Sequence, residues 1–194
     1  MAAILDIMIS FVFSGLLLVM GMKLNVYVSS YQQQCVVDLN AQQNCVELGR
    51  ILENDFYKIG YGDTTGRGSM RIADSTKIRF YADIDNNGST DSITYYTAKM
   101  VTKSKFANPH QMYLYRQVNT LTPVKMNLGL TNLRIQYFNL TGAKVDTLGQ
   151  IQALKVSLDI ESNAKMVNSG GKDTVYNKVH WEQYIVPKSL SGHY

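Results

Sequence analysis

The chain has 194 residues, of which 45% are hydrophobic and 10% aromatic, and its formal net charge is +4. This length accommodates one ordinary domain with an extension, and the composition is that of a globular protein. Lys and Arg are scattered along the chain instead of gathered in a stripe, so nucleic acid is not expected as the main partner. The two cysteines form no CxxC pair, which argues against a redox pair or a zinc site.

The first segment, MAAILDIMISFVFSGLLLVMGM, is almost wholly apolar and carries one charge, Asp6. A secretory signal would have a basic N-terminal region and a small-residue cleavage site, and neither pattern occurs here. The uninterrupted run at residues 7–22 is slightly short for a permanent membrane helix of about 20 residues. A buried core helix would need a protein layer to enclose it. We therefore expect a helix that lies first in a membrane and later in a protein assembly.

The next segment keeps a helical pattern. Apolar residues recur at mostly three- and four-residue steps, namely Leu24, Val28, Tyr31, Cys35, Leu39, Cys45, Leu48, Leu52, Phe56 and Ile59. This stripe predicts an amphipathic helix that ends near Gly60, and no proline interrupts residues 1–59. We expect one helix of roughly 85 Å at 1.5 Å per residue. Residues 1–28 would be its apolar assembly and membrane part, and residues 29–60 its amphipathic continuation.

Residues 61–194 have the pattern of a β-rich globular head. Short runs with strand character follow one another: KIRFYAD, SITYYTAKM, QMYLYRQVN, NLRIQYFNL, IQALKVSLDIES and YNKVHWEQYIVP. Clusters of Gly, Asn and Pro separate them, and the short connections predict an antiparallel sheet. The stretch NAKMVNSGGKDTVY is expected to be a loop. The predicted fold class is α+β, with a long N-terminal helix packed by its second half on an antiparallel sheet.

Several stretches, in this order, resemble type IV pilins and pseudopilins. They are LNAQQNCVELGRILENDFYKIGYG, IRFYADIDNNGSTDSITYY, MYLYRQVN, LGLTNLRIQYFN and YIVPKSL, and they are most similar to the PilW-like branch that groups with J-type minor pseudopilins. The resemblance implies a structural subunit of a cell-surface filament, a helical homopolymer of identical subunits. Each subunit would be anchored in the inner membrane before the pilus or secretion machinery assembles it. Two alternatives stay open: a minor pilin or pseudopilin of such a machine, and a membrane-anchored ligand-binding module.

The resemblance gives Asp6 an interpretation. Mature pilins carry a glutamate at their fifth position, and its carboxylate neutralises the α-amino group of a neighbouring subunit. Asp6 is fifth if Ala2 is the first mature residue and sixth if Met1 is. An acid at the membrane surface, or one stabilised by the helix dipole, would fit the same position.

Two glycines in the apolar segment are further assembly candidates. Gly15 and Gly21 lie inside the expected helix, where glycine costs about 1 kcal/mol relative to alanine. Loss of helix on assembly, as occurs in many pilins, and close packing of helices through small residues both explain them.

The stretch DIDNNGSTD is a candidate for calcium. Asp83, Asp85, Asn87 and Asp91 match ligand positions of a calcium loop, but Thr94 stands where the bidentate glutamate belongs. A hairpin with an Asn-Gly turn is the preferred interpretation, with calcium as the alternative.

The remaining chemistry-bearing residues give no catalytic pattern. Cys35 and Cys45 would lie about 15 Å apart on one helix, too far for an internal disulfide. We expect them to be small buried residues, with an intersubunit bond in an oxidising location as the alternative. The three histidines lack metal-ligand spacing, and no G-x-S-x-G or P-loop occurs. We therefore do not expect an enzyme.

Overall fold

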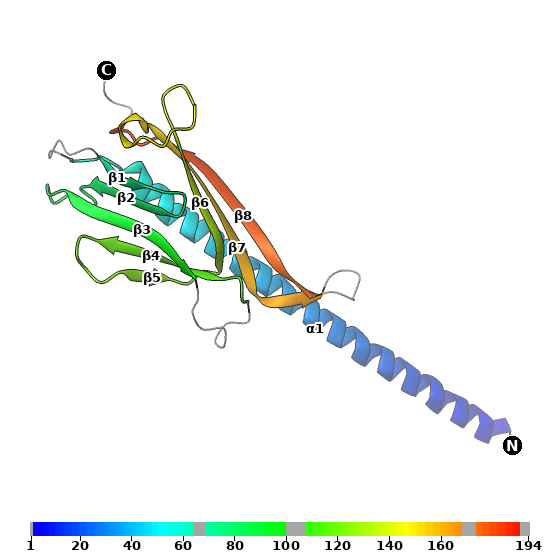
Figure 1. The fold of residues 1–194 in the computed structure, drawn as a ribbon. Helices are drawn as coiled ribbons and strands as arrows, with labels where there is room; N and C mark the ends of the chain where they lie inside the picture. Colours follow the sequence, from blue (N-terminus) through cyan, green and yellow to red (C-terminus); the bar gives the residue numbers. More distant parts are fainter. Residues whose placement is uncertain (1, 64–68, 100–107, 168–173, 191–194) are drawn as a thin grey trace. The chain divides into compact units, whose positions relative to one another are not determined.

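The structure is a computed structural model, and it describes residues 2–63, 69–99, 108–167 and 174–190. One long helix, α1 (Ala2–Tyr57), is followed by antiparallel strands (Figure 1). The chain forms two compact units, Met1–Leu39 and Asn40–Tyr194. In the second unit the last turns of α1 pack on the sheets, which confirms the predicted α+β class.

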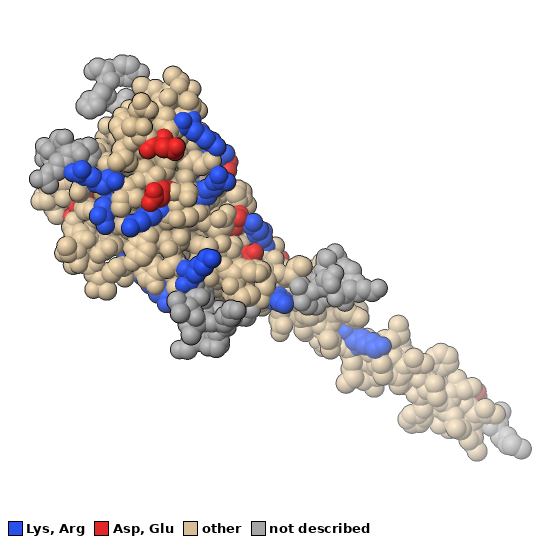
Figure 2. All heavy atoms as spheres, viewed as in Figure 1, with Lys and Arg blue, Asp and Glu red and all other residues tan. Residues whose placement is uncertain are grey.

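The first unit is a helix whose apolar side chains are exposed. Phe11 is 76% exposed, Leu17 69% and Val26 69%. Charged residues are rare up to residue 37, where only Asp6 and Lys23 occur, and Figure 2 shows this stretch almost free of coloured side chains. The helix is long and apolar enough to cross a membrane.

The strands of the second unit form two antiparallel sheets where the sequence predicted one. Sheet A has the order β1 (Met70–Ala73), β2 (Lys77–Ala82), β3 (Asp91–Lys99), β4 (Met112–Val118) and β5 (Val124–Met126). Sheet B has the order β6 (Leu130–Phe138), β7 (Ala153–Val167) and β8 (Thr174–Ile185), with a short 3-10 turn, η1 (Leu148–Gln150), before β7. Each sheet therefore follows the order of the chain, as a series of hairpins does.

The loop predicted for NAKMVNSGGKDTVY is wrong at both of its ends. Residues 163–167 continue β7, and residues 174–176 begin β8, so the two strands form one long hairpin. The register shifts between Glu161 and Lys165, which marks an irregularity in β7. The GGKD part of this stretch lies outside the described residues.

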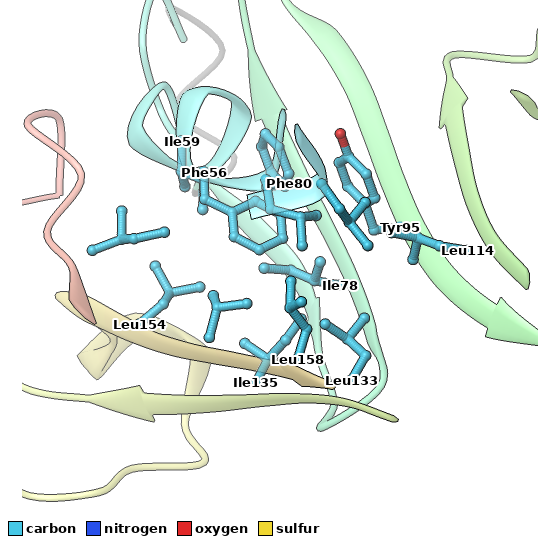
Figure 3. Close-up of a cluster of buried hydrophobic side chains, with 14 of the residues drawn as sticks. Phe56, Ile59, Ile78, Phe80, Tyr95, Leu114, Leu133, Ile135, Leu154 and Leu158 are labelled. Carbon is cyan, nitrogen blue, oxygen red and sulfur yellow. The ribbon is translucent and has the colours of Figure 1, made fainter. Parts of the chain in front are cut away.

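The core of the second unit lies between α1 and both sheets. Leu48, Leu52 and Phe56 of the helix are fully buried. The Phe56 ring packs edge-on against Phe80 of β2 and Tyr95 of β3, with ring centroids 5.8 and 5.4 Å apart. Figure 3 shows this cluster, with Tyr95 turning its hydroxyl oxygen away from the apolar side chains. The predicted stripe is therefore the core-facing side of α1 in the second unit, from Ala41 onward.

Gly49 in α1 has a packing role that its position in the sequence did not indicate. A Cβ at this residue would lie 2.7 Å from Cε2 of Trp181 on β8, closer than real contacts allow. Glycine lowers helix propensity, but here it lets the indole approach the helix backbone. The close contact fixes the position of the helix on sheet B.

The helix ends as the sequence predicted, with a glycine shortly after its last turn. Gly60 has a φ of 79°, a left-handed conformation that favours glycine. Its N–H donates to the carbonyl oxygen of Tyr81 at 2.8 Å, and Asp83 N–H donates to the carbonyl oxygen of Tyr61 at 2.8 Å. These bonds hold the chain after α1 against the end of β2 and place it beside the Asp-rich hairpin.

Candidate functional site

The predicted assembly residues all lie in the first unit. Asp6 is exposed, and its backbone carbonyl accepts a hydrogen bond from Ser10 Oγ at 2.8 Å. Ala2 begins α1, and the helix continues unbroken through Gly15 and Gly21. No neighbouring atom lies within 4 Å of a Cβ built at either glycine. Pairing of Asp6 with another subunit's α-amine involves two copies of the chain and stays a prediction.

The structure brings together three of the four calcium candidates. Carboxylate oxygens of Asp83, Asp85 and Asp91 lie within 4.8 Å of one another; the first two belong to the connection between β2 and β3, and Asp91 is the first residue of β3. Asn87 instead directs its side-chain oxygen to Ser89 N–H at 2.7 Å. Thr94 lies within β3, where its hydroxyl oxygen accepts a hydrogen bond from Arg79 Nε at 2.9 Å. Carboxylates are suitable calcium ligands, but the strongest ligand of a calcium loop has no counterpart at Thr94.

The buried carboxylate of this hairpin already has backbone partners. Asp83 accepts hydrogen bonds from Asn87 N–H at 3.1 Å and from Gly88 N–H at 2.9 Å. The connection spans residues 83–90, and its left-handed residues are Asn86 and Gly88. A two-residue Asn-Gly turn would need positive φ at Asn87 and Gly88, so that form of the hairpin prediction is wrong. The two hydrogen bonds that Asp83 accepts show that its carboxylate stabilises the turn.

A buried polar triad joins α1 to sheet A, and sequence reasoning missed it. The Tyr95 hydroxyl donates to Asp55 Oδ2 at 2.6 Å. Arg116 Nε donates to the same oxygen at 2.7 Å and to the Tyr95 hydroxyl at 3.0 Å. Burial raises the pKa of Tyr95, and the negative charge of Asp55 raises it further, against the opposing effect of Arg116. The sequence carries one sign of a buried partner, an acid on the apolar face of the predicted helix, but it does not identify Tyr95 or Arg116.

A groove runs beside the triad, between α1 and the edge strand β5. Its volume is about 1210 Å³, and Asp55 and Arg116 contribute to its wall. Val46 and Val124 add apolar surface, and both are more than half exposed. Such a mixture of apolar walls and a few polar groups can receive an extended peptide or a small molecule.

The outer face of sheet B carries a second polar cluster, centred on Asp159. This carboxylate binds Lys178 Nζ at 2.8 Å, His180 Nδ1 at 2.7 Å and Asn132 Nδ2 at 3.1 Å. Burial works against its ionisation, but the hydrogen bonds from Lys178, His180 and Asn132 leave the pKa of Asp159 lowered. Within the described residues, His180 is hydrogen-bonded to Asp159 and to no hydroxyl or thiol.

No disulfide joins Cys35 to Cys45, as their spacing on the helix predicted. Cys45 is buried in the core of the second unit, and burial raises the pKa of its thiol, with a further contribution from the charge of Asp159. Cys35 is exposed. A raised pKa keeps the Cys45 thiol protonated and unreactive at neutral pH, which fits a packing role.

Comparison with protein-family models, with curated proteins and with solved structures gives no significant match.

The raised pKa of Tyr95 predicts a loss of stability at high pH. In the unfolded chain a tyrosine ionises near pH 10, whereas the folded protein keeps the Tyr95 proton to higher pH. Above about pH 10 the free energy of unfolding should therefore fall with rising pH, by up to about 1.4 kcal/mol per pH unit from this one group. The Tyr95→Phe variant should lose this part of the slope. Urea denaturation between pH 9 and 11 measures it, with Tyr81→Phe as control. Equal slopes in wild type and Tyr95→Phe would contradict the assignment.

The two interpretations of the hairpin separate in an Asp83→Ala variant. If Asp83 serves as backbone acceptor, its removal leaves Gly88 N–H without a partner and Asn87 N–H with only its 3.2 Å bond to Asp85 Oδ1, and it should cost about 1–3 kcal/mol. The loss should be the same with a chelator and with excess calcium, and Asp85→Ala, at an exposed residue, should cost less. If calcium binds, the wild type should instead melt at a lower temperature in chelator, because a ligand stabilises the state that binds it. A saturable calcium signal in calorimetric titration would overturn the preferred interpretation.

Proposed function

We propose that this chain is the structural subunit of a filament in which the N-terminal helices of many copies pack together. The exposed apolar surface of residues 4–28 carries this proposal. Full burial of a Val, Leu, Ile, Phe or Met side chain is favourable by about 1.5–3 kcal/mol relative to leaving it exposed to water. Large side chains of this kind follow one another around the helix. A surface of this size is covered either by lipid or by protein, and a filament subunit uses both in turn.

The single acid near the start of the helix supports the same proposal. A charge at the end of an apolar helix is costly in a dry environment unless it has a partner. A free α-amino group on another copy is a partner of opposite charge, and stacking of parallel helices would bring it to Asp6. Pairing of this kind would also fix how far neighbouring helices are displaced along their axes.

The second unit has a core that does not need the first. Its buried residues begin at Ala41, and both sheets pack around α1 residues after that point. A subunit of this design can fold its head before assembly and keep it folded in the filament. The proposed location is therefore an inner-membrane anchor before assembly and a cell-surface filament afterwards.

The alternative of a membrane-anchored binding module rests on the groove between α1 and β5. In that case the apolar helix would stay in the membrane and the head would act as a monomer. A minor subunit at the tip of a filament would share the helix surface but would not form filaments alone. The state of the purified chain after removal of detergent distinguishes these cases.

Removal of the apolar helix should abolish assembly without unfolding the head. A chain that begins at Ser29 lacks the surface proposed to drive packing and retains the whole core of the second unit. It should be a soluble monomer by sedimentation, with a cooperative thermal transition. Native filaments from this shortened chain would show that the helix is not the assembly element.

Substitution of Asp6 should weaken assembly and leave the head folded. Asp6→Ala strands the neighbouring α-amine without a counter-charge, whereas Asp6→Glu keeps the charge and serves as the matched control. Filament yield, measured by pelleting, should fall for Asp6→Ala and recover for Asp6→Glu. Unchanged yield from Asp6→Ala would count against the pairing.

A further inference from the structure

The outer face of sheet A carries a row of side chains that crosses four strands. Lys77 of β2 lies opposite Tyr96 of β3, Tyr96 lies opposite Tyr115 of β4, and Tyr115 lies opposite Lys125 of β5. Side chains alternate between the faces of a sheet, and the neighbouring residues Ile78, Tyr95 and Leu114 are fully buried on the other face. We call Lys77, Tyr96, Tyr115 and Lys125 the tyrosine row.

The two rings of the tyrosine row and the adjacent ring of Tyr113 form an aromatic surface. Tyr96 and Tyr115 are stacked, with ring centroids 5.1 Å apart and an interplanar angle of 9°. Tyr113 meets Tyr115 at 6.2 Å, and Lys125 Nζ lies 3.5 Å from the centroid of Tyr113. All three rings are partly exposed. Tyrosines are enriched at protein interfaces because they offer large contact areas and few rotatable bonds.

The face around the tyrosine row is positively charged. Arg71, Lys77, Arg79 and Lys125 lie on it, and no Asp or Glu occupies an outward position on these five strands. The acid nearest to Arg71 and Lys77 in the sequence, Asp74, belongs to the turn between β1 and β2. Within the described part of the chain, none of the four cations forms an ion pair, whereas the lysines of sheet B's outer face at positions 155 and 178 are both paired with acids. Sheet A therefore presents cations that its own strands do not neutralise.

An opposite charge lies at the far end of the same sheet. Asp83, Asp85 and Asp91, which we call the acidic hairpin, keep carboxylate oxygens within 4.8 Å of one another. Their hydrogen bonds come from neutral groups, and none of them is in an ion pair with a described residue. Lys77 is the first residue of β2, and the acidic hairpin begins directly after Ala82, the last residue of that strand. At 3.3 Å per residue, the two patches are therefore roughly 17 Å apart along the strand.

We propose that the acidic hairpin of one subunit docks on the tyrosine row of a second copy. This inference rests on the proposed filament and names a contact between its heads. Two different, complementary patches on one chain make a heterologous contact, and such contacts generate open-ended polymers when the rotation does not close a ring. The docking joins the three clustered carboxylates to the unpaired lysines and places the hairpin over the stacked rings. Charge complementarity of this kind fixes the orientation of partners as well as their attraction.

Charge reversal in the full-length chain tests the docking. The row variant carries Lys77→Glu with Lys125→Glu, the hairpin variant carries Asp85→Lys, and a third variant combines them. At low ionic strength each reversal alone should raise the concentration needed for half-assembly about tenfold, a typical size for close charge pairs. The combined variant should recover most of the assembly. Lys144→Glu with Lys165→Glu changes the net charge as the row variant does, away from the row, and should have no effect.

The outcomes separate the docking from the filament itself. Equal assembly of all variants, or a combined variant as defective as the single reversals, would overturn the docking and leave the filament standing. Absence of filaments from the wild-type chain would overturn both. Asp85→Asn removes the charge but keeps the acceptor oxygen for Asn87 N–H, and it should show a smaller loss in the same direction. If all variants assembled like the wild type and only the row variant lost binding to dextran sulfate, the face would be assigned to an anionic polymer instead.

Discussion

The exposed apolar surface of the first part of α1 is the constraint on which the remaining features depend. Removing side chains such as Phe11 and Leu17 from water lowers the free energy, and the first unit has no other element to cover them. Lipid and the same surface of other copies are the two environments that do so. Both disfavour an unpaired charge, which is why Asp6 is the most informative residue of the segment. In the proposed filament, the helices of neighbouring copies cover this surface, and a neighbouring α-amine pairs with this charge.

The second part of α1 meets a different requirement, because it organises the core of the head. Leu52 and Phe56 are buried in the core between the helix and the two sheets, and Gly49 admits the Trp181 ring. Asp55 adds a polar contact to Tyr95 and Arg116, which ties the helix to β3 and β4. Breaking a buried pair of this kind is costly because one charge is left alone. A force applied to the first part of α1 would therefore reach a head that is fastened to the helix by both apolar and polar contacts.

Local periodicity explains which parts of the fold could be predicted from the sequence. The helical stripe ending at Ile59 and the alternation in β7 and β8 are repeated signals, and the longer strands were found from them. Strands β1 and β5 have only 4 and 3 residues, so no period could develop. The extension of β7 and β8 was missed because Asn, Lys and Gly usually mark loops. The buried triad and the tyrosine row depend on which strands become neighbours, and no local pattern contains that register.

Electron cryomicroscopy of the wild-type chain after detergent removal tests the central claim most directly. The account predicts filaments of uniform diameter, with helices of residues 4–28 from many copies packed along the axis and Asp6 beside a neighbouring N-terminus. Dispersed particles whose apolar helices remain in detergent or lipid would contradict it. So would an ordered filament built from contacts between heads alone, with the apolar helices on its outside.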